Sequence, residues 1–452
     1  MAKSGSKSPL FTGPLTMAEI ILYNLAGLAF NVYDTVLYSW VNYFYNPPEG
    51  SDVVRYLPAA AFTIAAILFG GRILDAVTDP LIGYWSDHTK SRWGRRKPYI
   101  FIANPILFLA FIFVWTPPAA GASVTNIIYL TAVLFVYYWA YTAVLIPWFA
   151  VLPEMSPKKN ERAKIASIGV ALGILGALIA GGLYGTLISR FGVFAMALIL
   201  GAVAFIAGEL SLLGIKQRHR IDESEKLSGF FGAMKEAFAD RQIFSFAAMI
   251  TLVQLTYQLM LMNTPYLVTL ILKRPDTDSS ILVAEVVIAM AVSIPLWYFL
   301  VKRYPKRQVF RGVIIAMIAG FALSFFIGDY PLVSPFVQAM IIFPVAAIPL
   351  GGVFLMSLLL IADLTDYGEL KTGKRKEAIY YGIYGFVRKT GWALSAVILN
   401  GVLAAFGYSA ENPTGVKVVW VVCAASCLVG LLLFAPYKIG DTKEETKKIM
   451  NL

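Results

Sequence analysis

The strongest constraint on this chain is a series of twelve apolar runs, each long enough to cross a lipid bilayer. Roughly 20 mainly apolar residues in an α-helix span the hydrocarbon core. The chain has 452 residues, 58% of them apolar and 14% charged, which is not the composition of a soluble protein. The runs cover residues 17–45, 54–84, 98–117, 124–155, 163–189, 192–214, 243–272, 279–301, 309–329, 332–364, 377–407 and 415–437. The sequence therefore predicts an all-α membrane protein with twelve transmembrane helices and no cleaved signal peptide.

The positive charges alternate with these runs. The net charge is +11, and most Lys and Arg lie in alternate loops and in both tails. The basic loops cover residues 86–98, 156–164, 216–241, 302–311 and 371–376. An excess of Lys and Arg in short loops marks the cytoplasmic side. This pattern predicts a multi-pass protein of the plasma (inner) membrane with both termini in the cytoplasm. Since topology accounts for the charge, no nucleic-acid partner is expected.

One long hydrophilic segment, 216–242, divides the runs into two sets of six. In this segment Phe230, Phe231, Met234 and Phe238 recur at helical spacing, so we expect an amphipathic helix on the membrane surface. The predicted domains are a six-helix bundle (1–215), this linker, a second six-helix bundle (243–438) and a cytoplasmic tail (439–452). Two such bundles form the plan of the major facilitator superfamily, in which the substrate binds near the midplane between them.

The second run contains two carboxylates, Asp75 and Asp79, four residues apart and hence on one helical face. They lie about 15–20 Å from the cytoplasmic end of the helix, at 1.5 Å per residue. A charge at this depth costs about 3 kcal/mol or more unless it is neutralised. A structural ion pair with Arg72 is the alternative interpretation, but it accounts for Asp75 and leaves Asp79 unexplained. We therefore expect the two carboxylates to bind a monovalent cation.

A buried lysine is predicted in the eleventh run. Lys389 lies about 18 Å into the helix that begins near Glu377. A lysine at the midplane needs a carboxylate, and the Asp75/Asp79 pair is the expected partner. Competition between this ammonium group and a cation for the same carboxylates would couple ion binding to helix movement.

At these residues the chain resembles a known family. Asp75-x3-Asp79-Pro-x2-Gly83, followed by Ser91-Arg-Trp-Gly-Arg95, is similar to the helix-two signature of the melibiose-permease-like symporters. These are the glycoside–pentoside–hexuronide:cation symporters of the major facilitator superfamily. Further matches are Tyr141-Thr142 before Ile146-Pro147, Ala362-Asp363-x2-Asp366-Tyr-Gly-Glu369, Glu377-Ala-Ile-Tyr380 and Val387-Arg-Lys389-x-Gly391. The resemblance implies that Asp75, Asp79 and Thr142 bind the cation, and that Lys389, together with Arg72, couples ion to substrate.

The same resemblance places the substrate but leaves its class open. Two aspartates that hold the galactosyl group in melibiose permease are replaced here by Asn31 and Leu145. Family alignment puts six residues around the central cavity: Asn31, Asp34, Tyr141, Leu145, Trp148 and Phe354. Vertebrate sodium-dependent lysophosphatidylcholine symporters use the same cation scaffold and also lack both aspartates. We expect a glycoside-type solute, with a lysophospholipid as the alternative.

The expected activity is transport, driven by sodium, a proton or lithium as coupling ion, with no other cofactor and no enzymatic reaction. A remote alternative is a membrane prenyltransferase, because Asp-x3-Asp and Asp363-x2-Asp366 superficially resemble sites for magnesium diphosphate. The depth of the first pair and the midplane Lys389 argue against that alternative. The expected partners are one small solute and membrane lipids, with the protein acting as a monomer.

Overall fold

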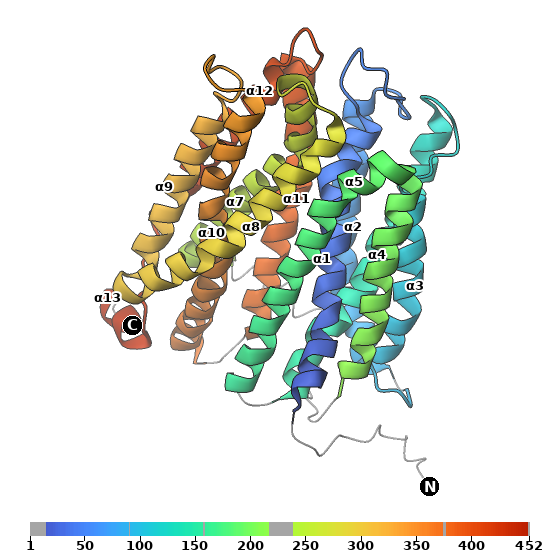
Figure 1. Cartoon of the computed structure of the whole chain (residues 1–452). Helices are drawn as coiled ribbons and strands as arrows, with labels where there is room; N and C mark the ends of the chain where they lie inside the picture. Colours follow the sequence, from blue (N-terminus) through green and yellow to red (C-terminus); the bar gives the residue numbers. More distant parts are fainter. Residues whose placement is uncertain (1–14, 90, 157–158, 217–237, 374–376, 451–452) are drawn as a thin grey trace. The chain divides into compact units, whose positions relative to one another are not determined.

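The computed structural model describes all residues except 1–14, 90, 157–158, 217–237, 374–376 and 451–452. In this part of the chain the regular elements are helices, and no β-strand occurs (Figure 1). The first half contains α1 (Met17–Tyr45), α2 (Ala60–His88), α3 (Lys97–Phe113), α4 (Val124–Met155) and α5 (Lys159–Gly214). The second half contains α7 (Arg241–Tyr266), α8 (Ser279–Arg303), α9 (Lys306–Ser324), α10 (Pro335–Thr372), α11 (Glu377–Phe406), α12 (Thr414–Phe434) and α13 (Lys443–Met450). A π-helical turn (Leu267–Ile271) and a 3₁₀ turn (Asp276–Asp278) connect α7 to α8.

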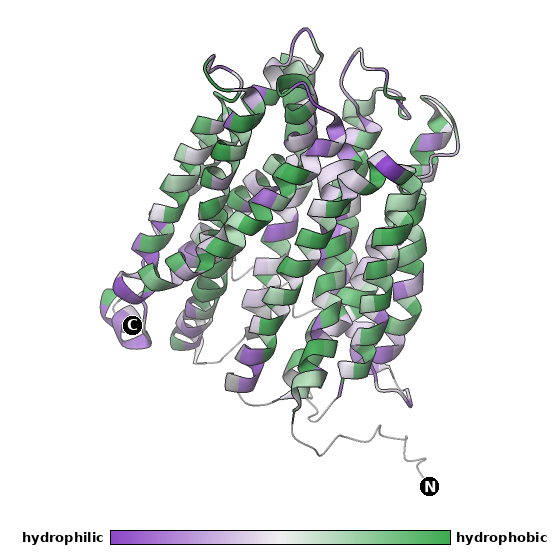
Figure 2. Ribbon diagram, in the orientation of Figure 1, coloured by the Kyte–Doolittle hydropathy of each residue, from purple (hydrophilic) through white to green (hydrophobic). Residues whose placement is uncertain are grey.

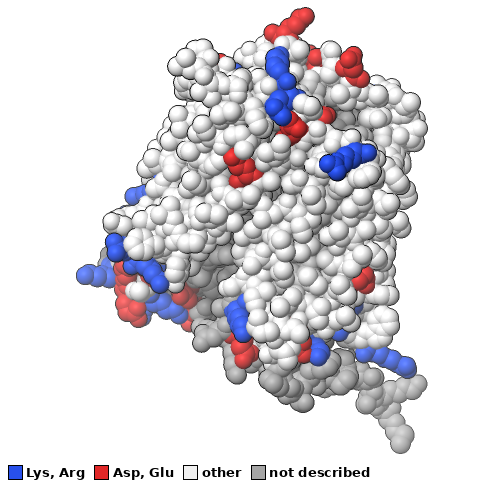
Figure 3. Space-filling model, in the orientation of Figure 1, with Lys and Arg blue, Asp and Glu red and all other residues white. Residues whose placement is uncertain are grey.

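The helices have the length and composition of membrane spans. Among the described residues, ten helices are long and apolar enough to cross a bilayer, and α3 is apolar but shorter. Within α5, Gly192 has φ +82° and ψ 169°, a conformation that breaks the helix and that glycine adopts without a Cβ clash. Figure 2 shows apolar residues along most of the long helices, whereas the short α13 is mainly hydrophilic, and in Figure 3 the charged residues on the visible face lie mainly near the helix ends. The all-helical, multi-pass architecture is confirmed, while the count of twelve spans stays a prediction.

The chain forms two compact units. Unit 1 comprises residues 1–41, 54–63 and 70–227, and unit 2 comprises residues 42–53, 64–69 and 228–452. The predicted limits of the two bundles, the linker and the tail stay predictions. Most of the predicted amphipathic linker helix, including Phe230, Phe231 and Met234, lies outside the described residues.

In unit 1, α1 and α5 approach each other closely because glycines line the contact. A Cβ on Gly169 would lie 2.6 Å from Asn24 Oδ1, and a Cβ on Gly173 would lie 2.9 Å from Asn31 Nδ2. Small residues at four-residue spacing allow such close backbone approach in membrane helices. The contact holds Asn31 against α5 and thereby orients one of the predicted solute residues.

Four charged side chains tie the ends of three helices together in unit 1. Arg96 donates to Asp87 at 2.8 Å and pairs with Glu154 at 3.0 Å. Arg95 also pairs with Glu154, at the end of α4. These basic residues therefore do more than set topology, because they join α2, the start of α3 and α4 within the same unit.

In unit 2, α7 packs against α11 and α12, and α10 packs against α8 and α9. An uncharged cluster holds residues 42–53 to this unit. Asn400 Nδ2 donates to Asn42 Oδ1 at 2.7 Å, and Asn46 Nδ2 donates to Asn400 Oδ1 at 2.9 Å. The hydroxyl of Tyr408 donates to Asn46 Oδ1 at 2.9 Å, and that of Tyr266 donates to the Asn46 carbonyl. All five side chains are buried, so their hydrogen bonds replace those that water would make.

Candidate cation and solute site

The two predicted cation ligands of α2 meet at one hydroxyl group of α4. Thr142 Oγ1 lies 3.1 Å from Asp75 Oδ1 and 3.1 Å from Asp79 Oδ1. Asp75 and Thr142 are fully buried, and Asp79 is partly buried. A hydroxyl has one proton to donate, so it satisfies one carboxylate at a time. The three predicted ligands are therefore brought together, with oxygen atoms facing a common point.

Arg72 forms an ion pair with Asp75, three residues later on α2. Its Nη1 donates to Asp75 Oδ2 at 2.7 Å, and the two side chains are 4% and 0% exposed. The guanidinium carbon also lies 4.6 Å from the ring centroid of Tyr38 and 5.0 Å from that of Tyr138. Aromatic faces attract a desolvated cation, so both rings help to hold Arg72 in the apolar interior. The structural interpretation of Arg72 and the cation interpretation of the aspartates are therefore compatible.

Tyr38 and Tyr138 were absent from the residues predicted from sequence. Helical spacing could have indicated both residues. Tyr38 follows Asp34 by one helical turn, and Tyr138 precedes Thr142 by one turn, so each tyrosine lies on the same helical face as a predicted site residue. A Cβ on Gly71 would overlap the Tyr138 ring, so glycine at this position lets the ring lie against α2. The Tyr138 hydroxyl is buried and makes no hydrogen bond within the described residues.

The site gathers several carboxylates. Asp34 accepts a hydrogen bond from the Tyr141 hydroxyl at 2.8 Å and lies within electrostatic range of Arg72. Asp34 and Asp75 thus both lie near the Arg72 guanidinium, and Asp75 shares the Thr142 hydroxyl with Asp79. Buried like charges need a counter-ion or a proton. Carboxylate and hydroxyl oxygens are the ligands that hard cations prefer. The cluster is therefore chemically suited to bind a cation or a proton.

The other predicted solute residues of unit 1 differ in what they can offer. Asn31 is partly exposed and donates Nδ2 to the Gly27 carbonyl, which leaves its carbonyl oxygen to accept a hydrogen bond. Trp148 donates its indole N–H to the Tyr23 carbonyl at 3.0 Å and stacks on Tyr23 at 5.0 Å. Trp148 can therefore present only ring surface to a solute. Leu145 is buried, 6% exposed, and adds an apolar surface.

Two predicted residues belong to unit 2. Phe354 in α10 packs edge-on against Tyr257 of α7, with ring centroids 5.7 Å apart. Lys389 in α11 is buried, 7% exposed, as its predicted depth requires. The expectation that Lys389 serves the Asp75/Asp79 pair stays a prediction, and so does the contact of Phe354 with the solute.

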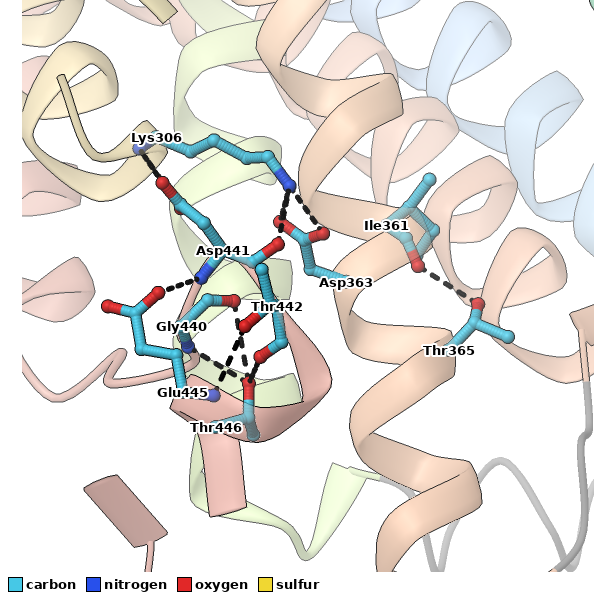
Figure 4. Close-up of polar contacts among 9 residues, drawn as sticks. All are labelled: Lys306, Ile361, Asp363, Thr365, Gly440, Asp441, Thr442, Glu445 and Thr446. Carbon is cyan, nitrogen blue, oxygen red and sulfur yellow. Dashed lines mark hydrogen bonds and ion pairs between the residues drawn. The ribbon is translucent and has the colours of Figure 1, made fainter. Parts of the chain in front are cut away.

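A second group of carboxylates lies in α10 and is held by lysines. Lys306 Nζ lies 2.7 Å from Asp363 Oδ1 and 2.8 Å from Oδ2, and it also donates to the Asp441 carbonyl (Figure 4). Lys443 of α13 donates to Glu369 at 2.9 Å and lies 3.8 Å from Asp366. The magnesium interpretation of Asp363 and Asp366 is not favoured, because lysines occupy the positions that a metal ion would take.

The comparisons with known proteins agree with this architecture. The sequence profile of a family described as MFS/sugar transport protein matches residues 22–441. The isoprimeverose transporter of Lactiplantibacillus pentosus is 25% identical over 96% of this chain and 91% of its own length. The sodium-dependent lysophosphatidylcholine symporter 1 of Gallus gallus is 22% identical over 88% of this chain and 83% of its own length. The crystal structure of the nucleoside transporter NupG superposes with a TM-score of 0.65 at 17% identity, covering 93% of this chain and 98% of that one. This likeness of structure shows the fold.

Proposed function

The chain belongs to the MFS/sugar transport protein family, and we propose that it is a cation-coupled symporter that carries a glycoside-type solute by alternating access. Family membership makes it a multi-pass membrane transporter rather than an enzyme, which removes the prenyltransferase alternative. The predicted resemblance to glycoside–cation symporters is confirmed by its relatives. The coupling ion, the solute and the location in the plasma membrane belong to the proposal.

One observation supports cation coupling above all others. Asp75 and Asp79, two carboxylates on one helical face, converge on the single Thr142 hydroxyl at 3.1 Å each in a buried region. Such an arrangement has its lowest free energy when a cation or a proton occupies it. Sodium is the proposed ion because it is a hard cation that oxygen atoms can coordinate, and because one relative is named as sodium-dependent. Lys389 is the proposed competitor that couples ion occupancy to conformational change.

The proposed class of solute is argued from the relatives and from residues of unit 1. The family description and the isoprimeverose transporter favour a sugar. Asn31 and Asp34 supply polar atoms, and Tyr141 and Trp148 supply ring surfaces, a combination that suits a glycoside. The lysophosphatidylcholine symporter keeps a lipid as the second candidate, and the apolar Leu145 favours it.

Uptake into proteoliposomes tests the proposal. Purified protein would be supplied with labelled glycosides and with a labelled lysolipid, with and without an inward sodium gradient. The proposal expects glycoside accumulation that the gradient stimulates and that Asp79→Asn abolishes. Accumulation that is equal with and without sodium would point to proton coupling. Uptake of lysolipid alone, displaced by no glycoside, would overturn the sugar assignment while leaving the cation site intact.

Leu145→Asp separates the two solute classes in a single variant. In a sugar pocket the added carboxylate can accept hydrogen bonds from hydroxyl groups, so galactoside binding should improve or at least persist. In a path for an acyl chain, a carboxylate costs several kcal/mol of desolvation. Lysolipid transport should then fall at least about tenfold. Leu145→Asn is the control for size and polarity without charge.

A further inference from the structure

A small cavity lies in unit 2, where the start of α7, the segment after α12 and the end of α13 meet. Its volume is about 310 Å³, and Arg241, Gln242, Pro436, Lys438, Ile449 and Met450 line it. These residues come from the first turn of α7, from the segment 436–438 and from the last turn of α13. The basic loops of the sequence predict that this end of the unit faces the cytoplasm.

The two basic side chains of this cavity have no partner in the part of the chain that the structure describes. Arg241 and Lys438 are both exposed, and neither side chain makes a hydrogen bond or ion pair within the described residues. Three other basic residues at this end are paired with carboxylates: Lys306 binds Asp363, Lys371 binds Asp240, and Lys443 binds Glu369. The cavity is therefore lined by two basic side chains that have no carboxylate partner among the described residues.

The nearest described carboxylate in sequence, Asp240, forms its hydrogen bonds and ion pair with residues other than Arg241. Its side chain caps α7 through the Gln242 N–H at 2.8 Å and accepts hydrogen bonds from Tyr367 and Lys371. Burial alone would raise the pKa of Asp240, but these hydrogen bonds outweigh it and hold the pKa below its ordinary value. Asp240 is thus an ionised group committed to α10, and Arg241 beside it is left for an external anion.

On one side of the cavity, the start of α7 is hydrogen-bonded to residues 436–438. Gln242 Nε2 donates to the Pro436 carbonyl at 3.1 Å, and Gln242 Oε1 accepts from the Lys438 N–H at 2.7 Å. This pair of hydrogen bonds fixes the backbone of residues 436–438 against α7. The positions from which the Arg241 and Lys438 side chains extend are therefore set by the fold.

The opposite wall is apolar and belongs to α13. Ile449, 43% exposed, and Met450 line the cavity, and Lys447 and Lys448 precede them in the same turn. The acidic residues of α13, Glu444 and Glu445, lie in its first turn, and Glu445 accepts a hydrogen bond from the Asp441 N–H. The end of α13 at the cavity is thus basic and apolar together, the composition of a helix at a membrane surface.

We propose that this cavity binds the phosphate of an anionic phospholipid headgroup from the cytoplasmic leaflet. Arg241 and Lys438 contact the phosphate oxygens, and Ile449 and Met450 lie against the glycerol and the first acyl carbons. A free phosphate ion would use the two cations but would gain nothing from the apolar wall, so the geometry favours the lipid. Binding would hold α13 and residues 436–438 against the membrane, and it is independent of the solute and of the coupling ion.

Native mass spectrometry of the full-length protein tests the site. Detergent-solubilised protein is titrated with phosphatidylglycerol and with phosphatidylcholine, whose choline group cancels the phosphate charge. Arg241→Gln with Lys438→Gln should reduce the preference for phosphatidylglycerol roughly tenfold, because each basic group contributes to attraction of an anionic lipid. The charge-preserving pair Arg241→Lys with Lys438→Arg should retain that preference.

The matched control removes two charges from the same end outside the cavity. Lys302 and Arg303, at the end of α8, lie over the rings of Tyr298 and Phe299, and Lys302→Gln with Arg303→Gln should leave lipid preference unchanged. Equal loss in the control and the cavity variant would show a general charge effect and overturn the proposal. Unchanged preference in the cavity variant would do the same. Inorganic phosphate that displaces phosphatidylglycerol at equal affinity would overturn the lipid assignment. Lys438→Gln alone, at an exposed side chain, gives the same comparison if the double variant folds poorly.

Discussion

α2 and α10 both carry carboxylates about one helical turn apart, yet the structure treats the two groups differently. On α2, Asp75 and Asp79 share the Thr142 hydroxyl, and Arg72 pairs with Asp75. On α10, both carboxylate oxygens of Asp363 accept hydrogen bonds from Lys306 Nζ. Glu369 and Asp366 lie near Lys443. The α10 group lies toward the helix end, where long lysine side chains can reach it, whereas the α2 group lies deep in its unit.

The difference teaches that spacing alone does not define an ion site. A carboxylate that already has an ammonium group at 2.7 Å gains little from a metal cation, since the lysine would have to leave. On α2, by contrast, two carboxylates converge on one neutral hydroxyl, so the oxygen atoms of all three side chains lie together. We infer that the α10 group, which lysines hold, is a structural network, and we propose the α2 group as the ion site.

The largest expected effect is on the α2 group. Asp75→Asn or Asp79→Asn should abolish sodium-driven accumulation, because an amide keeps the shape but removes the negative charge that attracts the ion. Asp366→Asn makes the same chemical change in the α10 group, at a partly exposed side chain, and should leave sodium stimulation intact. Uptake in proteoliposomes measures both. If both α2 variants retained sodium-stimulated accumulation, the comparison between the two helices would collapse.

The second test concerns Lys389, the lysine proposed to couple ion binding to solute transport. Lys389→Ala should weaken the sodium dependence of transport more than it weakens equilibrium binding of the solute, since Lys389 is proposed to compete with the ion. Lys389→Arg is the charge-preserving control. The measurements are solute binding and uptake at a series of sodium concentrations. Loss of solute binding with sodium dependence preserved would assign Lys389 to the solute instead.

Lys306→Met should act on stability. The substitution leaves Asp363 partly buried without its cation, and we expect a loss of about 2 kcal/mol in the free energy of unfolding after solvent screening is considered. The two side chains are 18% and 12% exposed, so the pair is only partly screened. Thermal denaturation in detergent gives the measurement. Adding Asp363→Asn should restore part of the stability, because the uncompensated charge is then removed. If the double variant were no more stable than Lys306→Met, the interaction between Lys306 and Asp363 would not contribute to the free energy of unfolding.

The smallest expected effect concerns the bridging hydroxyl. Thr142→Val keeps the shape of the side chain but removes the group that lies 3.1 Å from both carboxylates. The apparent affinity for the cation should fall about tenfold, the value expected for one hydrogen-bonding ligand at a charged site. Thr142→Ser retains the hydroxyl and should stay close to wild type. An unchanged affinity in Thr142→Val would remove Thr142 from the ligand set.

Much of the fold was predictable because the information is local. Apolar runs of sufficient length predicted the helices, and the break at Gly192 falls at the first residue of the sixth predicted run. The shared face of Asp75 and Asp79 followed from helical periodicity alone. Thr142 was named only through family resemblance, because its hydroxyl comes from a helix more than sixty residues away in sequence.

What periodicity could not predict is which side chains of distant helices meet. Tyr38 and Tyr138 flank Arg72 because α1 and α4 pack beside α2 and Gly71 leaves space for the ring. Lys306, in a predicted basic loop without acidic neighbours, acquires Asp363 and Asp441 from α10 and the C-terminal segment. The sequence by itself determined the helices and the faces on which their charges lie, since both depend on the repeat of one helix. Only the tertiary structure decided which carboxylates are neutralised, because that depends on the packing of helices far apart in the chain.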